Sequence, residues 1–574
     1  MSSPKSMRGR RWLSPSTDPG RLSPIETENP VALPRWLRRL ATTRGLIDAD
    51  ELERYLEPSL GHLDDPAQLA DMGRACEALC LALEERRQIT VYGDYDVDGV
   101  CATTVLVAFL RELDAAVDYY IPDRRSEGYG LNADAVREIA ERSDVLITVD
   151  CGITAQAELQ EARRLGLDVI VVDHHQVPDA LPPAVACLNP HRPDCDYPYK
   201  PLCAAGLAFL LVVALRRALR ERGAFADGGE PDVRPLLDAV ALATVADMVP
   251  ITGTNRVLVA SGLRRMRQNP RPGIRALMEV AGVDGREVRA RDLGFKLGPR
   301  INAKGRLAHA GEAVELLLTP DASRARHLAA ALDQANGERR TLERSTQDQA
   351  VALAEAAGYG ESPAIVVGDS SWHPGVLGLV ASRLVSRFNR PAIVIGEGGK
   401  GSARSIDGLN IHDALGDCAA HLDKFGGHTA AAGLTLKTGA LAEFRTSFAA
   451  AVEARLGPPP YIAELRPDLE VEDRELSLQM VQELSLFEPF GQENPEPLLL
   501  ARRMRVREKR VVGGDHLKLS LGDGGHDAIG FGLGEHLETV PDEVDVVFRV
   551  ERNVFRGRES LQLRIDDLRL PEEG

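Results

Sequence analysis

Three aspartates occupy alternate positions of the stretch VYGDYDVDGV (residues 91–100), and a glycine follows them. This spacing matches the first half of an EF-hand calcium loop, which closes with a glutamate at its twelfth position. The twelfth position here is Val105, whose side chain has no oxygen. The β-branched and aromatic run before Asp94 also predicts a strand, whereas an EF-hand loop joins two helices. The three acids therefore indicate a different kind of site.

Other acids and imidazoles follow other apolar runs of the chain. Asp150 comes after LITV, the triplet Asp173, His174 and His175 comes after VIVV, and Asp247 ends the run ALATVA. In an open parallel sheet, ligands bind beyond the carboxyl ends of the strands. We therefore expect these side chains to meet the first three acids at one edge of a sheet.

The chemistry of such a cluster favours metal ions. One aspartate at a strand end is as readily explained as a helix N-cap, and this applies to Asp150 taken alone. Several carboxylates held together repel one another unless cations neutralise them. Oxygen and imidazole ligands suit Mn²⁺ or Mg²⁺, and two such ions bridged by a carboxylate activate water for attack at phosphorus.

The surrounding pattern predicts the elements that position these residues. From about residue 80, apolar strands alternate with helices, which indicates βαβ units and a parallel sheet covered on both faces. Helices dominate from 204 to about 357, and a second α/β segment runs to about 455. GPPP at 457–460 is a linker, and the short alternating strands after it indicate a small β-barrel.

Length and composition predict a multidomain protein of the cytoplasm. The chain has 574 residues, a formal net charge of −17 and eight cysteines without a paired framework, which indicates reduced thiols. We find no secretory signal, and the longest apolar run, from Ala204, is too short to span a bilayer. The acidic balance excludes a generally basic nucleic-acid binder but leaves room for a local basic groove.

Two polar patterns allow more than one interpretation. Asp333, Asn336, Arg340 and Glu343 share one face of a predicted long helix, and a solvated face is the favoured explanation. In the barrel, Arg503, Arg505, Arg507 and Lys509 alternate, so on a regular strand they would line one face. That face is expected either to bind single strands or to protect an exposed edge by charge.

The motifs as a whole resemble a known family. GDYDVDG, VDCG and DHH (173–175) resemble the DHH phosphoesterase superfamily and, within it, the RecJ family of bacterial single-strand-specific 5′→3′ DNA exonucleases. The resemblance covers about residues 70–570 and includes PDRRSEGYGLN (122–132), LPPAVACLNPHRPDCDYPYK (181–200), ATVADMVPITGTNR (243–256), LGPRINAKGRL (297–307), WHPGVLGLVASRL (372–384), GSARSIDGLNIHDAL (401–415), KFGGHTAAAGL (424–434) and LFEPFGQENPEP (486–497).

The resemblance implies an α/β fold: a parallel-sheet DHH lobe and a second α/β DHH-associated lobe joined by a long helix, then an OB-like barrel. The domains implied are an irregular and helical segment (1–75), a metal-binding catalytic domain with a helical extension (76–310), the connecting helix (311–357), a substrate-binding domain (358–456) and an OB-fold-like single-strand-binding domain (461–574).

The resemblance also implies roles for individual residues. The ligands of two Mn²⁺ or Mg²⁺ ions would be Asp94, Asp96, Asp98, Asp150, His174 and Asp247, with Asp150 bridging and His175 stabilising the transition state or donating a proton. Tyr92 stands where many superfamily members have a histidine, and Asp94 is the natural substitute ligand. Substrate would be bound by Arg124, Arg300, Asn302, Arg306, Ser402, Arg404, Gly426, Gly427 and His428.

The function implied is 5′→3′ hydrolysis of single-stranded DNA to 5′-mononucleotides in recombination and repair. A phosphodiesterase for short oligonucleotides or cyclic dinucleotides is the first alternative, and the additional barrel argues against it. An inactive replication scaffold is the second, and the complete set of acids argues against it. The resemblance also implies a monomer that does not bind membranes and whose partners include single-strand-binding protein, a helicase or recombination mediators.

Overall fold

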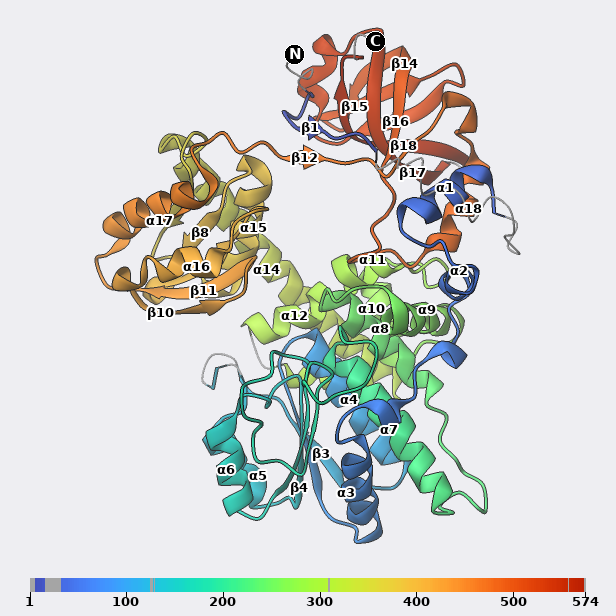
Figure 1. Cartoon of the computed structure of the whole chain (residues 1–574), viewed down its shortest axis with the longest axis vertical. Coiled ribbons are helices and arrows are strands. Elements are labelled where there is room, and N and C mark those ends of the chain that lie inside the picture. The colour runs from blue at the N-terminus through green and yellow to red at the C-terminus, as the bar shows by residue number, and fades with distance from the viewer. Residues whose placement is uncertain are drawn as a thin grey trace.

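The structure, a computed structural model, describes residues 6–15, 33–123, 127–128, 130–307, 310–555 and 557–571. The chain forms two α/β lobes and a barrel, and a long helix joins the two lobes (Figure 1). The linker strand β12 (Glu464–Leu465) crosses from the second lobe to the barrel, where the first and the last described residues also lie. The predicted fold class is confirmed in each of its parts.

The first lobe is built on a five-stranded parallel sheet of order β3-β2-β4-β5-β6. Its central strands are β-branched and buried on both faces, as a sheet between two helical layers requires. The strands are β2 (Ile89–Gly93), β3 (Val117–Tyr120), β4 (Val145–Val149), β5 (Asp168–Val172) and β6 (Ala186–Leu188). The helix α3 (Met72–Glu84) precedes these strands, and α4 (Val97–Glu112), α5 (Ala133–Ala140) and α6 (Gln156–Arg164) connect them.

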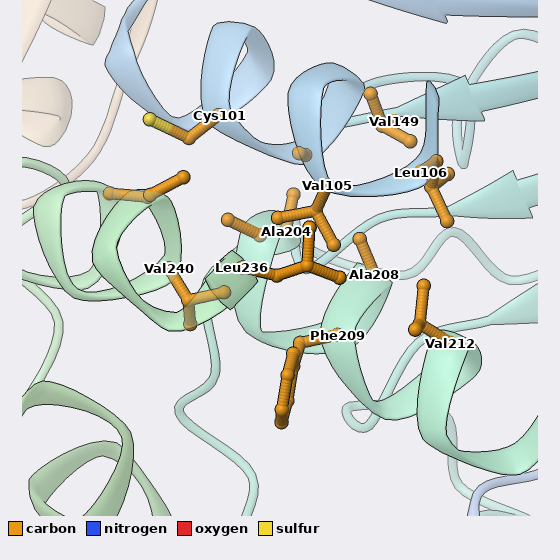
Figure 2. Close-up of a cluster of buried hydrophobic side chains, with 14 of the residues drawn as sticks. Cys101, Val105, Leu106, Val149, Ala204, Ala208, Phe209, Val212, Leu236 and Val240 are labelled. Carbon is orange, nitrogen blue, oxygen red and sulfur yellow. The ribbon is translucent and has the colours of Figure 1, made fainter. Parts of the chain in front are cut away.

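A helical extension packs on this sheet and buries the longest apolar run of the chain. That run forms α7 (Ala204–Glu221), which crosses α4, and Val105 and Ala208 lie in the interface together with Val240 of α8 (Figure 2). None of the described helices is both long and apolar enough to cross a membrane. The other helices are α8 (Leu237–Ala246), α9 (Gly253–Gln268), α10 (Pro272–Val280), α11 (Ala290–Asp292), the π-turn η5 (Leu293–Leu297), α12 (Gly298–Leu307) and α13 (Gly311–Leu318).

The predicted long helix is α14 (Ala322–Ala356). Its N-cap Asp321 accepts hydrogen bonds from the backbone N–H groups of Ser323 and Arg324. The prediction of a solvated polar face is wrong for Asn336, which is 3% exposed, although Arg340 is exposed. The helix α12 packs against this face, where its Arg300 donates to Asp333.

The second lobe has a mixed sheet of order β10-β11-β9-β8-β7. Only β7 and β8 are parallel, and the other neighbours pair antiparallel. The strands are β7 (Ile365–Gly368), β8 (Ala392–Ile395), β9 (Lys400–Arg404), β10 (Leu422–Gly427) and β11 (Ala431–Leu436). The helices are α15 (Leu377–Phe388), α16 (Ile411–Gly416) and α17 (Leu441–Leu456).

The C-terminal sheet closes into a barrel, because β14 pairs with β15 on one side and with β17 on the other. The barrel strands are β14 (Leu499–Val512), β15 (His516–Leu521), β16 (His526–Gly530), β17 (Glu543–Phe555) and β18 (Arg558–Arg569), and the short β13 (Leu469–Glu470) adds to β14. The helix α18 (Leu478–Leu484) precedes the barrel strands.

The expected row of cations along one face of β14 is wrong. The register shifts between Ala501 and Met504, and again between Val506 and Glu508. After the second shift, Lys509 pairs with the buried Leu519 and its ammonium group donates to a backbone carbonyl, that of Val540. Bulges re-aim side chains, so the alternation in sequence does not survive as a face.

The N-terminal segment belongs in space to the barrel. The helix α1 (Arg35–Thr43) buries Trp36 and Leu40 in the barrel's hydrophobic cluster, and α2 (Ala49–Leu56) adds Leu52. The strand β1 (Arg11–Trp12) pairs in parallel with β12. Chain ends that are distant in sequence therefore share one core.

The eight cysteines are all buried and none forms a disulfide.

Candidate metal centre

The acid loop follows β2 and leads into α4. The carboxylate of Asp96 caps α4 by accepting from the N–H groups of Asp98 and Gly99, so an N-cap explains part of its role. Both oxygens of Asp98 accept backbone N–H groups at the start of α7, those of Ala204 and Ala205. A Cβ on Gly99 would lie 2.5 Å from the backbone of Asp94, so only glycine lets the loop close this tightly.

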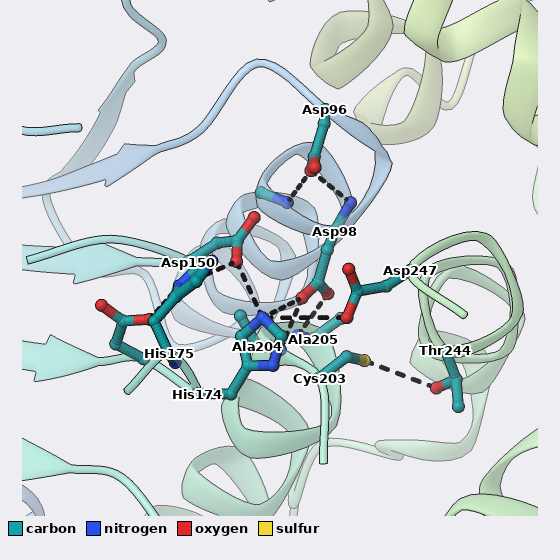
Figure 3. A network of polar contacts seen from close by, with 12 residues as sticks. Asp96, Asp98, Asp150, His174, His175, Cys203, Ala204, Ala205, Thr244 and Asp247 are labelled. Carbon is teal, nitrogen blue, oxygen red and sulfur yellow. Dashed lines mark hydrogen bonds and ion pairs between the residues drawn. The ribbon is translucent and has the colours of Figure 1, made fainter. Parts of the chain in front are cut away.

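Asp150 follows β4 in a left-handed conformation, with φ of 61°. This region is uncommon for residues other than glycine, although aspartate tolerates it better than most. Such conformations concentrate at functional sites, where the surrounding structure enforces them. The turn directs the Asp150 carboxylate toward His174 (Figure 3).

The DHH triplet follows β5, and its aspartate orients the second histidine. Asp173 is buried, and its Oδ1 lies 2.7 Å from His175 Nδ1 while also accepting the His175 N–H. Its Oδ2 accepts the N–H of Ile153. Asn189, fully buried after β6, donates to the carbonyl of His175. These contacts place the Nε2 edge of His175 away from the Asp173 carboxylate.

Three carboxylates surround one nitrogen of His174 (Figure 3). Its Nε2 lies 3.3 Å from an oxygen of Asp150 and 3.7 Å from oxygens of Asp98 and Asp247. Asp247 is the C-cap of α8, so a helix end rather than a strand end delivers this acid. A second group consists of Asp94, Asp96 and Asp150, whose oxygens lie within 4.8 Å of one another. Asp150 thus belongs to this group and also lies beside His174 of the first.

Without cations, the environment of the site disfavours the ionised form of its carboxylates and the protonated form of His174. Burial, followed by repulsion from the neighbouring acids, raises the pKa of Asp150, and the same two causes raise the pKa of Asp247 to about 9. Burial also raises the pKa of Asp98 and lowers the pKa of His174. Burial opposes protonation of His175, but the hydrogen bond and charge of Asp173 outweigh it and raise the His175 pKa.

The donor set fits divalent cations. His174 Nε2 and Asp247 Oδ2 are buried and have no hydrogen-bond partner in the described part of the chain. Around an octahedral ion with ligands at about 2.1 Å, neighbouring ligand atoms stand about 3 Å apart and opposite ones about 4 Å apart. The observed 3.3–3.7 Å separations lie within that range. Carboxylates with one imidazole, and no thiolate among the clustered groups, suit Mn²⁺ or Mg²⁺.

The motif GPRINAKGR on α12 braces the acid loop. Asn302 accepts the N–H of Val97 at the start of α4, and a Cβ on Gly305 would lie 2.6 Å from the carbonyl oxygen of Tyr95. Arg300 donates to Asp333 and to two backbone carbonyls. Two residues expected to bind substrate, Arg300 and Asn302, therefore contact the protein itself. Arg124 and the side chain of Arg306 lie outside the described residues.

Tyr92 is fully buried. Its hydroxyl donates to the carbonyl of Gly130, and its ring stacks on Tyr120. Tyr92, which stands where many superfamily members have a histidine, therefore binds the loop that follows β3.

The second lobe brings an uncompensated arginine and a hydroxyl together. Ser402 and Arg404 both belong to β9, and a Cβ on Gly378 would lie 2.8 Å from Arg404 Nη2 and 3.5 Å from Ser402 Oγ. Gly378 thus lets the first turn of α15 cover the pair. Burial lowers the pKa of Arg404, and no carboxylate in the described chain forms an ion pair with it. A helix N-terminus, a guanidinium and a hydroxyl form an anion-binding arrangement.

The glycine pair and His428 form the turn between β10 and β11. Gly427 has φ of 150°, and a Cβ there would lie 2.4 Å from the carbonyl oxygen of Ala431, so this glycine is required. Gly426 has open space around its Cα. Arg404 pairs with Ala431, which places the arginine beside this turn. His428 and His174 line one cleft of about 870 Å³, so the two lobes face a common space.

Several contributors to this site carry no signal that sequence reasoning alone detected. The orienting roles of Asp173 and Asn189 depend on contacts across neighbouring strands, and Gly378 matters only because α15 covers β9. His191 and Gln176 also line the cleft. Asp173 and Asn189 lie inside recognised motifs, so position within a motif was the only available indication.

Comparison with known families divides the chain into three matched parts. Residues 88–244 match the DHH family N-terminal domain, residues 361–454 match the DHHA1 domain, and residues 467–567 match the RecJ OB domain.

Whole-chain relatives decide the family. The single-stranded-DNA-specific exonuclease RecJ of Dickeya dadantii is 41% identical over 95% of this chain and 97% of its own length. The protein of the same name from Escherichia coli is 39% identical over 94% of this chain and 96% of its own. The chain belongs to the RecJ family.

Solved RecJ structures share this architecture. RecJ from Thermus thermophilus in complex with Mn²⁺ superposes with a TM-score of 0.84 at 33% identity, covering 98% of this chain and 80% of that chain. The Mg²⁺ complex gives a TM-score of 0.79 at 30% identity, covering 98% and 79%. These RecJ structures carry the ions that the donor set of this chain suits.

Proposed function

We propose that this chain is an exonuclease that uses two Mn²⁺ or Mg²⁺ ions to degrade single-stranded DNA from its 5′ end, releasing 5′-mononucleotides during recombination and repair. The observation that carries the proposal is the buried acid cluster of the first lobe, whose His174 lines the same cleft as His428 of the second lobe. The named activity of the RecJ relatives supports the same conclusion.

Six residues would hold the ions. Asp94 and Asp96 belong to one group, Asp98, His174 and Asp247 belong to the other, and Asp150 would bridge them. When bound, the ion pair supplies an activated water and neutralises charge on the phosphate under attack. Asp173 fixes the Nδ1 side of His175, so the Nε2 side of that ring is the one that donates to a phosphate oxygen or to the departing 3′ oxygen.

The second lobe would set polarity. Hydrolysis of the first internucleotide bond breaks the link between phosphorus and the 3′ oxygen of the terminal nucleotide, so the shortened strand begins with a new 5′-phosphate. Arg404 and Ser402, covered by the first turn of α15, suit a terminal phosphate because it carries more charge and more free oxygens than an internal one. A pocket for the 5′-phosphate is therefore refilled after each cycle. Gly426 and Gly427 admit the strand backbone beside His428.

Single-strand selectivity would arise from the cleft and the barrel. A cleft closed between two lobes admits one strand and excludes a duplex, and an OB-type barrel extends the binding surface for a long strand. A phosphodiesterase for short oligonucleotides or cyclic dinucleotides gains nothing from this barrel. An inactive scaffold does not require all six clustered ligands. We also propose a monomer in the cytoplasm whose partners include single-strand-binding protein, a helicase or recombination mediators.

Digestion of labelled DNA tests the proposal. Strands carrying either a 5′-phosphate or a 5′-hydroxyl, labelled at either end, are incubated with Mn²⁺, with Mg²⁺ or with a chelator. The expected result is metal-dependent release of mononucleotides from the 5′ end, faster with a 5′-phosphate. Release starting at the 3′ end refutes the polarity, and preference for dinucleotides over long strands favours the oligonucleotide phosphodiesterase.

A further inference from the structure

The middle of α14 buries polar side chains that the rest of the protein does not satisfy. At its two ends α14 packs apolar side chains into the cores of the first and second lobes. Between these ends, Asn336 is 3% exposed and Arg339 is 9% exposed. In the described chain, Asn336 Oδ1 and Arg339 Nε have no hydrogen-bond partner. A buried polar group without a partner is destabilising, so its retention calls for an explanation.

The other buried arginines of the described chain have acceptors within the protein for their guanidinium groups, as a structural role requires. Arg256 donates to the carbonyls of residues 55 and 486–489, and Arg390 donates to five carbonyls around residues 360–389 and 461. Arg192 and Arg569 are held by aspartates. For Arg339, the nearest acid is Glu343, with Nη2 and Oε2 3.8 Å apart, which is too long for a hydrogen bond.

The charges around Arg339 favour an anion. Burial, followed by the nearby Arg340 and Arg300, lowers the pKa of Arg339, and Glu343 opposes this effect. Arg300 is committed to Asp333, and Glu343 is shared with Arg383 of α15 at 3.9 Å. Asn336 lies one turn before Arg339, so the two side chains share one face of α14.

The position of the pair matches the path of the substrate. α14 joins the two lobes (Figure 1). Along this helix, Asp333 accepts from Arg300 of α12, and Glu343 lies 3.9 Å from Arg383 of α15. The helix α12 braces the acid loop, and α15 covers Ser402 and Arg404. The two polar groups therefore lie between the element that supports the metal centre and the element that covers the anion pocket.

We propose that Asn336 and Arg339 form a phosphate subsite on the bridging helix, which holds one internal phosphate of the DNA strand. This inference rests on the proposed function, because the ligand is the strand being degraded. The guanidinium fork offers paired N–H donors to two phosphate oxygens, and the side-chain NH2 group of Asn336 offers a further donor. The unpartnered Oδ1 of Asn336 is an acceptor, so it is not satisfied by the phosphate, and the subsite rests on Arg339. The phosphate oxygens would accept hydrogen bonds from Arg339, whose Nε has no partner in the described chain.

Salt-dependent binding of a long single strand in the presence of EDTA tests the subsite without hydrolysis. Replacing Arg339 by glutamine is expected to weaken binding about tenfold, the lower end for a charged hydrogen bond. The slope of log K against log salt should fall by about 0.7, the value for one lost phosphate contact on a single strand. The melting temperature should stay unchanged or rise, because no protein hydrogen bond is lost.

Matched variants separate binding from folding. Arg390→Gln removes a buried arginine with satisfied donors, so it should lower the melting temperature and leave the salt slope unchanged. Arg339→Lys should keep the slope and lose part of the affinity, and Asn336→Asp should weaken binding by repelling the phosphate. An Arg339→Gln protein with the wild-type slope and a lower melting temperature overturns the subsite alone. Absence of salt-dependent binding by the wild-type chain overturns the proposed function as well.

Discussion

The two α/β lobes carry opposite kinds of charged residue near the cleft that His174 and His428 line. The first lobe buries carboxylates whose pKa values are raised by burial and mutual repulsion, as for Asp150 and Asp247. The second lobe presents His428 to the cleft, with Ser402 and an arginine, Arg404, on the neighbouring strand. Clustered carboxylates remain ionised only when cations neutralise them. A buried guanidinium that no carboxylate pairs with is best satisfied by an anion.

In the proposed function this difference is the reason why the site needs both lobes. Metal ions would complete the first lobe and a phosphate the second, so a phosphodiester with two cations would satisfy both at once. The predictions below test this division of charge, from the largest expected effect to the smallest.

Asp150→Asn is expected to abolish hydrolysis while leaving the protein folded, because it removes the bridging charge and almost no volume. The measurement is mononucleotide release from a labelled strand with Mn²⁺, with circular dichroism to confirm the fold. Asp179→Asn, at another acid of the same cleft but outside the clustered ligands, is the control and should retain activity. A folded Asp150→Asn enzyme with near-normal turnover contradicts the two-metal assignment.

Arg404→Ala is expected to reduce the preference for a 5′-phosphate over a 5′-hydroxyl by about 1.5–3 kcal/mol, the range for hydrogen bonds to charged groups. The quantity to compare is the ratio of kcat/KM for the two substrates. Arg387→Ala, which removes an exposed arginine paired with Glu355 in the same lobe, is the control. Full retention of the preference in the Arg404→Ala enzyme rules out this pocket.

The stability of the metal-free protein should fall as pH rises. Asp247 has an ordinary pKa of 3.8 and a folded-state pKa of about 9, so its folded form prefers the protonated carboxyl. That contribution is present at low pH and is lost between about pH 4 and pH 9. The melting temperature of the chelated protein should therefore decrease across this window, and the increase produced by Mn²⁺ should be larger at pH 8 than at pH 6. An Mn²⁺ effect independent of pH would argue against neutralisation of the acids.

The smallest expected effect concerns the barrel. Because the bulges break the row of cations, the exposed Arg505 and the tethered Lys509 should differ in their effect on binding. Arg505→Ala should lower the salt slope for single-strand binding by about 0.7, and Lys509→Ala should not change it. Equal effects of the two variants would restore a continuous face of cations.

Much of the first lobe could be predicted from the sequence, because its information is local. Strand and helix periods were clear, and acids placed directly after buried strands must meet at the sheet edge. The bracing role of Asn302 was not predictable, since it depends on α12 reaching the acid loop across more than 200 positions of the chain.

The expectations that were wrong also depended on contacts between segments that are distant in the sequence. The face of β14 was mispredicted because one extra residue at a bulge reverses the direction of every later side chain. The buried face of α14 was mispredicted because polar residues normally face water, and only the packing of α12 shows that Asn336 does not. The attachment of α1 to the barrel joins residues at opposite ends of the sequence, which no local pattern reports.

Counting the bound ions tests the central claim most directly. The metal-free protein is titrated with Mn²⁺, and the free ion is followed by electron paramagnetic resonance. The account predicts two ions per chain, with Asp150→Asn retaining at most one at the same concentrations because the bridging carboxylate is lost. A single site in the wild-type chain, or two undiminished sites in Asp150→Asn, would contradict it.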